Sequence, residues 1–251
     1  MPRKTAAASL REKEPAAADD NTESRILDAA EELFSQFGFE GTAVRAINAV
    51  ASVNSGAIHY YFRTKEDLFR KVIQRRGRIL ADDRLRRLEA CREEPGRPPL
   101  LEQIVHAYIA PYANPALGSA EQRLRFARLR AHLMVEQREN DPSLLGNRHE
   151  STGQRFVDTL AGALPHLSRR EVRLRYLVMW SALNTLSAGL GPIALGERIL
   201  GEDENPVADF ERLIPRLTQM FADFFRADEH GETAKTRPGK ESKSKSRARD
   251  R

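Results

Sequence analysis

The chain has 251 residues, of which 40% are hydrophobic and 31% charged, and its formal net charge is +5. This composition favours a soluble, helix-rich protein. Because no stretch approaches roughly 18 uncharged apolar residues, we expect neither a membrane span nor a membrane partner. The first 20 residues have no apolar centre behind a basic start, so we expect no secretory signal and a cytoplasmic location. The single cysteine, Cys91, excludes an intramolecular disulfide framework.

Composition divides the chain into zones. Residues 1–20 are mostly Ala, Pro and charged residues without apolar periodicity, which predicts a disordered arm. Residues 227–251 contain no Leu, Ile, Val, Phe, Tyr or Trp, which predicts a disordered basic tail. Within that tail, residues 235–251 hold eight basic and two acidic side chains, a net charge of +6, so the rest of the chain is close to −1. The excess of positive charge therefore lies in the tail and not in the part of the chain that is expected to fold.

Helical periodicity covers nearly all of residues 21–226, and strand signals are absent, so the predicted fold class is all-α. The first helix is expected near 22–37, capped by Asp20 and ended by Gly38. Thr42 can cap a short second helix, residues 52–56 form a break, and a third short helix follows at 56–61. Thr64 with Asp67 predicts the start of a long helix that reaches about Arg92. Further helices are expected near 100–112, 120–138, 143–163, 169–190 and 206–226.

The second and third short helices, joined by a tight turn, indicate a helix-turn-helix unit. Its small core would come from Ile47, Ala51, Val53, Ile58 and Phe62. The third helix would present short polar side chains beside Gly56, which lets such a helix enter the major groove and reach base edges. Between residues 42 and 78 there are eight basic residues and only two acidic ones, a balance that suits a phosphate-facing surface.

The run from Gly38 to Leu68, with Ile26-Leu-Asp-Ala-Ala and Leu33-Phe before it, resembles the DNA-binding domain of TetR/AcrR-type transcriptional regulators. The resemblance covers about residues 22–76. It implies a helix-turn-helix DNA-binding domain at 21–76 and a larger effector-binding and dimerisation domain at 77–226. It further implies a homodimeric regulator, acting as a repressor on a pseudo-palindromic double-stranded DNA operator, which a small hydrophobic or amphipathic effector releases.

Position by position, the resemblance places Thr42 at a cap that contacts phosphate, Arg45 at a basic position and Lys65 at the start of the fourth helix. Ser52 replaces the usual turn glycine, at a cost of about 1 kcal/mol if its backbone is left-handed. The residues expected to contact DNA are Thr42, Arg45, Asn54, Ser55, Gly56, Ala57, His59, Tyr60 and Lys65. Ordinary packing on a short helix is the alternative for the aromatic residues among them.

In the second domain, polar and aromatic residues on apolar helices are candidates for an effector pocket, although each alone could be core or surface. They are His106, Tyr108, His132, Met134, Tyr176, Trp180 and Asn184. Trp180 is favoured because an amphipathic ring can face a cavity. Two helices, near 169–190 and 206–226, have wider apolar arcs than one core-facing stripe needs. The resemblance therefore suggests a dimer interface with Leu183, Leu186, Leu217, Phe221 and Phe224.

No cofactor, metal site or catalysis is expected, because the histidines lack metal-ligand spacing and no nucleophile–base set is evident. Two other function classes stay open at this point. One is a protein that binds nucleic acid without sequence preference through its basic tail. The less favoured one is an enzyme with an all-helical body. A sequence-specific footprint on DNA would separate the regulator from both.

Overall fold

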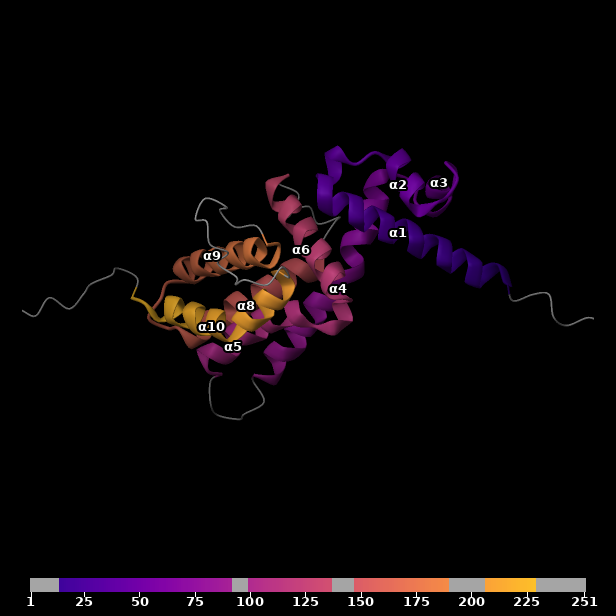
Figure 1. Ribbon diagram of the computed structural model, residues 1–251. Coiled ribbons are helices and arrows are strands. Elements are labelled where there is room, and N and C mark those ends of the chain that lie inside the picture. The colour runs from indigo at the N-terminus through magenta and orange to yellow at the C-terminus, as the bar shows by residue number, and fades with distance from the viewer. Residues whose placement is uncertain (1–13, 92–98, 137–146, 190–205, 229–251) are drawn as a thin grey trace, which may run out of the picture.

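A computed structural model of the chain describes residues 14–91, 99–136, 147–189 and 206–228 (Figure 1). The regular elements in these residues are all helices, as the sequence predicts. Their bounds are α1 Glu14–Gly41, α2 Val44–Ala51, α3 Ala57–Tyr61, α4 Lys65–Ala90, α5 Leu101–Ile109, the 3₁₀ turns η1 Ala110–Ala113 and η2 Pro115–Leu117, α6 Ala120–Val135, α8 Asn147–Ala163, α9 Arg169–Ser187 and α10 Pro206–Arg226. None of the described helices combines the length and the apolar character that a membrane crossing needs.

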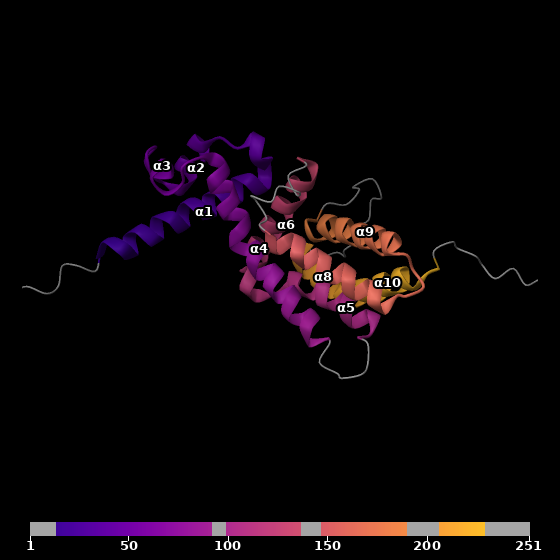
Figure 2. The same cartoon turned by 180° about the vertical axis from the view of Figure 1, so that it is seen from behind.

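The helices α1, α2, α3 and the first half of α4 form a small unit at one end of the molecule (Figures 1 and 2). Its core consists of side chains that recur at helical spacing, including Ile26, Phe34, Ile47 and Phe69, all of them fully buried. The rings of Phe34 and Phe69 meet edge to face, with centroids 4.8 Å apart. The predicted apolar stripe of the first helix is therefore the surface on which α2 and α4 pack.

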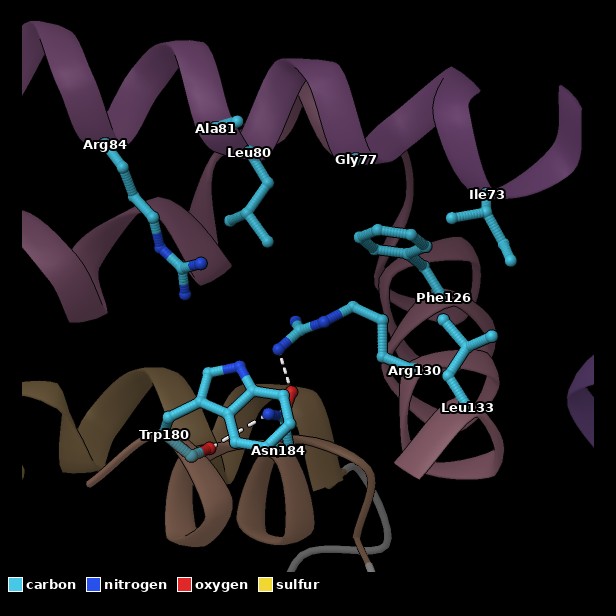
Figure 3. A pocket seen from close by; sticks show the side chains of 10 residues that line it. All are labelled: Ile73, Gly77, Leu80, Ala81, Arg84, Phe126, Arg130, Leu133, Trp180 and Asn184. Atoms are coloured by element: carbon cyan, nitrogen blue, oxygen red, sulfur yellow. Dashed lines mark hydrogen bonds between the residues drawn. The ribbon is translucent and has the colours of Figure 1, made fainter. Parts of the chain in front are cut away.

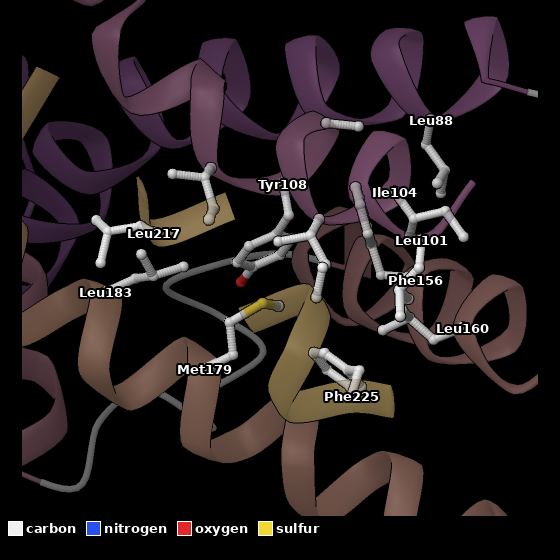
Figure 4. Packing of buried hydrophobic residues seen from close by; sticks show 14 of the residues in the cluster. Leu88, Leu101, Ile104, Tyr108, Phe156, Leu160, Met179, Leu183, Leu217 and Phe225 are labelled. Carbon is white, nitrogen blue, oxygen red and sulfur yellow. The ribbon is translucent and has the colours of Figure 1, made fainter. Parts of the chain in front are cut away.

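The remaining helices form the larger body of the molecule. There α5, α8, α9, α10 and the second half of α4 enclose an apolar core that includes Tyr108, Phe156, Leu183 and Phe225 (Figure 4). Tyr108 stands edge to face against Phe156, with ring centroids 4.9 Å apart. This core is separate from that of the small unit, as expected for two domains that each bury their own apolar surface.

Helix α4 belongs to both parts of the molecule. Thr64 caps it, since its hydroxyl accepts from the Asp67 amide at 3.1 Å, and the helix then continues for 26 residues. Leu68, Phe69, Val72 and Ile73 lie in the small core, whereas Leu88 lies in the large one. The predicted domain boundary between residues 76 and 77 thus falls inside one continuous helix.

A buried ion pair fixes α4 to its neighbours at this boundary. Arg76 Nε donates to Glu31 Oε1 of α1 at 2.7 Å, and both side chains are nearly inaccessible to solvent. A second guanidinium nitrogen of Arg76 donates to the carbonyl of Leu117 in η2. Breaking a buried pair by removing one partner typically costs about 3–5 kcal/mol, because the other charge stays buried. Arg76 therefore ties α1, α4 and η2 together.

Helix α6 also bridges the two parts, because it packs along α1 (Figure 1). Leu129 and Leu133 of α6 are buried in the core of the small unit. At the end of the helix, Glu136 Oε1 accepts from the backbone amide of Phe39 at 2.9 Å. That amide follows Gly38, whose φ of 69° interrupts α1 where the sequence predicts the first helix to end.

The predicted arm and the predicted N-terminal cap need correction. Helix α1 begins at Glu14, so residues 14–20 are helical and Asp20 lies inside the helix instead of capping it. Three consecutive alanines, Ala16 to Ala18, have the highest helix propensity of any residue and extend the helix without apolar periodicity. Residues 1–13 of the predicted arm and residues 229–251 of the predicted tail lie outside the described residues.

Candidate nucleic-acid interface and cavity

The turn between α2 and α3 is short, and the conformation of Ser52 and the hydrogen bonds of Asn54 determine its backbone. Ser52 closes α2 in the left-handed conformation, with φ 52° and ψ 48°. Two residues later, Asn54 Oδ1 accepts from the Gly56 amide at 3.1 Å, and the Asn54 carbonyl accepts from the Ala57 amide, also at 3.1 Å. These bonds satisfy backbone donors at the start of α3, which the five-residue helix cannot do itself. The turn thereby sets the direction in which α3 leaves α2.

Arg25 of α1 holds the same turn from the outside, a role that the sequence gives no signal for. One of its guanidinium nitrogens donates to the carbonyl of Ala51 and, at 3.0 Å, to that of Ser52. These carbonyls lie at the C-terminal end of α2, where the helix dipole favours a positive charge. Arg25 therefore stabilises the end of α2 and the left-handed residue that follows it.

Helix α3 buries one side and exposes the other. Ile58, together with Phe62 just after the helix, faces the small core, whereas His59 and Tyr60 point away from it. Tyr60 is 75% exposed although it is a large aromatic residue, and its ring stands edge to face against Tyr61. Most of the other predicted DNA contacts are also exposed, namely Arg45, Asn54, Ser55 and Gly56, and Ala57 is half-buried. These predicted recognition residues, except half-buried Ala57, are therefore accessible to solvent.

The structure does not support the predicted role of Thr42. Its side chain is buried, and its hydroxyl donates to the Gly38 carbonyl at 2.7 Å, so it fixes the loop after α1. The residue at the cap of α2 is Ala43, which has no side-chain acceptor. Lys65 is only half-exposed, with its amino group 4.2 Å from the centre of the Phe39 ring. This cation–π contact holds the amino group of Lys65 against Phe39, at the end of α1.

The positive charge of α4 is also less available than the sequence suggests. Arg70 is paired with Asp67, Arg75 with Asp28 and Glu31, and Arg76 with Glu31. By contrast, Arg63, Lys71 and Arg78 are exposed. With Arg45 of α2, these three residues are the exposed basic side chains of this region, so they are the ones available for phosphate contacts.

The larger body contains a cavity between α4, α6 and α9 (Figure 3). Two of the predicted pocket residues, Trp180 and Asn184, line it. Tyr108 and Tyr176 do not line it; Tyr108 is in the large core and Tyr176 packs against that core, with their hydroxyls 3.2 Å apart. The wall also includes Arg84 and Arg130, which sequence reasoning missed because a charged side chain is usually read as a surface residue.

Three predicted pocket residues do not reach the cavity. His106 lies on the exposed side of α5. His132 and Met134 are half-buried on α6, and His132 lies beside Gly38 at the contact between α6 and α1. The helical turn repeats every 3.6 residues, so α6 turns these positions away from the cavity that Phe126, Arg130 and Leu133 face.

Two of the predicted dimer residues are in the core of their own chain. Leu183 and Leu217 are buried in the large core, and Leu186 and Phe221 are half-buried against it. Of the five, only Phe224 is exposed. Among residues 169–187 and 210–226, the large apolar side chains that α9 and α10 expose are Leu174, Leu177, Val178, Met220 and Phe224, which we call the apolar face. Among the described residues, no group of three or more His, Cys, Asp or Glu could hold a metal ion.

Models of known protein families match both the small unit and the larger body of the chain. A model of the tetR family of bacterial regulatory proteins matches residues 26–72, and one of the tetracyclin repressor-like C-terminal domain matches residues 106–223. Together the two models cover well over half of the chain. The chain belongs to the TetR family.

The curated relatives match only part of this TetR-family chain, 22% of it for the first and 28% for the second relative below. The repressor NicS of Pseudomonas putida is 42% identical over 55 residues, and the regulator RutR of Escherichia coli is 42% identical over 69. These matches span only 26% and 31% of the two relatives. A TetR-family regulatory protein from Rhodococcus RHA1 shares the fold with a TM-score of 0.55 at 15% identity, over 80% of this chain and 96% of that one.

The left-handed Ser52 gives a testable prediction for stability. A side chain in this conformation costs about 1–2 kcal/mol, and glycine avoids that cost while losing about 0.5–1 kcal/mol more conformational entropy on folding. Ser52→Gly should therefore raise the free energy of unfolding by about 0.5–1 kcal/mol in urea titrations. Ser55→Gly is the matched control, since φ is negative at Ser55, and it should not stabilise the protein. Equal effects of the two substitutions would contradict this account of the turn.

Proposed function

We propose that the chain is a sequence-specific DNA-binding repressor that acts as a homodimer and leaves its operator when a small organic effector binds in the cavity. The observation that carries the proposal is the exposed side of α3. His59 and Tyr60 are exposed to solvent on a helix whose opposite side is buried in the small core. Exposed side chains with hydrogen-bonding groups on one side of a short helix are suited to contact base edges in a groove of DNA.

The chemistry of α3 fits the major groove of DNA. The helix begins with two small residues, Gly56 and Ala57, which allow its backbone to approach the bases. His59 and Tyr60 supply hydrogen-bonding groups. Arg45 on α2 and Arg63 after α3 flank this surface with positive charge. Such flanking charges contact phosphates and position the helix without reading sequence. The helix-turn-helix thus combines the two kinds of contact that an operator requires.

Dimerisation is supported by the apolar face of α9 and α10. Leu174, Leu177 and Met220 are each more than half exposed, with exposures of 54%, 52% and 56%. They lie on neighbouring helices of one chain, because α9 and α10 pack against each other (Figure 2). Contiguous apolar surface of this kind marks an interaction site. A two-fold pairing of this face with its copy would bury it and set the two α3 helices apart on the same DNA.

Base reading by α3 can be tested on an operator selected from random duplex DNA. His59→Ala and Tyr60→Ala should each weaken operator binding by about 1–3 kcal/mol, because base-edge contacts are lost, and should change binding to unrelated DNA much less. Fluorescence anisotropy at one fixed salt concentration measures both affinities. His166→Ala, an exposed histidine between α8 and α9, is the control and should bind like the wild type. Equal losses on operator and unrelated DNA would refute base reading by α3.

The apolar face can be tested by sedimentation. Leu177→Glu places a charge in the middle of this face and should turn the dimer into a folded monomer with reduced operator affinity. Leu100→Glu, at an exposed leucine just before α5, is the matched control and should remain dimeric. Circular dichroism verifies that both variants are folded. A wild-type chain that sediments as a monomer at micromolar concentration would overturn the dimer proposal.

A further inference from the structure

The cavity between α4, α6 and α9 has an unusual combination of lining groups (Figure 3). Most of its wall is apolar, with Leu80 from α4, Phe126 and Leu133 from α6 and Trp180 from α9. Its polar groups are the guanidinium groups of Arg84 and Arg130 and the amide of Asn184. Two positive charges therefore face an apolar space inside the protein.

Arg84 is buried without a full set of partners. Its side chain is 1% exposed, and its Nε donates to the backbone carbonyl of Tyr108 at 3.1 Å. The guanidinium lies over the ring of Tyr108, 3.8 Å from the ring centre, and its Nη2 has no hydrogen-bond partner. A buried N–H group of a charged side chain that lacks an acceptor is costly, so a missing acceptor is expected.

Arg130 faces the same space from α6. It is 9% exposed, and its Nη2 donates to the hydroxyl of Tyr112 at 2.6 Å and to Oδ1 of Asn184. Its guanidinium is 4.7 Å from the centre of the Tyr112 ring. Both acceptors are neutral groups, and they orient the guanidinium without neutralising it.

The charge of this cavity is not balanced within the described residues. Among the described residues, Arg84 and Arg130 donate to neutral oxygens and lie over aromatic rings, and neither forms an ion pair with Asp or Glu. Burial by itself would raise the pKa of the Tyr112 phenol, yet the nearby Arg130 and Arg84 outweigh it and lower that pKa. The phenol thus responds to a positive potential. A buried charge without a counter-charge is unfavourable and is normally paired.

We propose that the cavity binds an organic monoanion, whose carboxylate lies between Arg84 and Arg130 and whose compact apolar body lies against Phe126 and Trp180. The inference rests on the proposed effector role and gives the chemical class of the effector. The carboxylate would supply the missing charge and accept from the free Nη2 of Arg84. Arginine suits this task because its planar fork matches the two carboxylate oxygens.

The size and polarity of the cavity favour a carboxylate over other anions. Its volume is about 30 Å³, room for about two water molecules, which accommodates the carboxylate group alone. The apolar body of the ligand therefore needs the half-buried ring of Trp180 to move aside. Inorganic phosphate carries more charge and has no apolar part to contact Leu80, Phe126 and Trp180. Trp180 is half-buried, so its indole borders the ligand and reports its arrival.

The proposal is tested first on the unaltered protein. Benzoate, 3-phenylpropionate, hexanoate and octanoate are each compared with the matched neutral amide and with inorganic phosphate, at constant ionic strength. Melting temperature and the fluorescence of Trp180, the only tryptophan, are measured. At least one carboxylate should raise the melting temperature and change the fluorescence, with its amide binding about ten- to hundredfold more weakly. Amides or phosphate acting as strongly as the carboxylates, or no carboxylate acting at all, would overturn the proposal.

Variants then localise the anion. Arg84→Gln and Arg130→Gln should each weaken carboxylate binding about ten- to hundredfold, whereas Arg128→Gln, at an exposed arginine of the same helix α6, should not. If either glutamine variant fails to fold, Arg130→Lys is used in its place. This substitution keeps the positive charge but loses the planar guanidinium group, so the variant should stay folded and bind the carboxylate more weakly. Undiminished affinity in the folded cavity variants would overturn the assignment.

The two proposals fail in different ways in these experiments. Carboxylate binding is measured without DNA, and operator binding is measured without carboxylate. A protein that binds its operator but no carboxylate overturns the anion site alone. A protein that binds a carboxylate through Arg84 and Arg130 but no specific DNA sequence overturns the proposed repressor and leaves the anion site standing.

Discussion

The structure depends on one helix, α4, that is built into both halves of the molecule. Its capped start follows α3 directly, its first half completes the small core, and Arg84 further along faces the cavity. The buried pair of Arg76 and Glu31 fixes the helix to α1 between these two regions. The region next to α3 and the wall of the cavity therefore share one continuous helix, so a displacement of α4 along its axis would move both.

A second connection runs through α6, where neighbouring residues face different parts of the protein. Leu129 is buried in the small core, and Arg130, the next residue, faces the cavity. At the end of the same helix, Glu136 accepts from the Phe39 amide and so holds the loop that leads to α2. An anion that draws Arg84 and Arg130 together would act on α4 and α6 at once. Both helices pack on α1, the helix against which α2 of the helix-turn-helix lies.

The sequence predicted the elements well because local signals determine them. Thr64 and Asp67 mark the start of α4, Gly38 marks the break in α1, and the helices of the body follow from apolar periodicity. Local signals failed where tertiary packing decides the outcome. Periodicity could not separate the buried arc of α9 and α10, with Leu183 and Leu217, from the exposed one.

The same limit applies to the functional residues. His59 and Tyr60 could be found from their position in a matched motif. Arg84 and Arg130 could not, because their burial depends on Tyr108, which is 24 residues from Arg84, and on Asn184, which is 54 residues from Arg130. Thr42 was misread for a related reason, since its hydroxyl bonds back to Gly38 and not outward. A charged or polar residue can be assigned to a surface or a cavity only when its distant partners are known.

In the proposed dimer, the two copies of α3 enter successive major grooves on one face of a single DNA site. Hydroxyl-radical footprinting of the wild-type protein on a selected operator tests it most directly. We expect two protected half-sites on the same face of the duplex, related by two-fold symmetry and separated by about 10 base pairs or a multiple of that. A single protected patch, or uniform protection without half-sites, would contradict the claim.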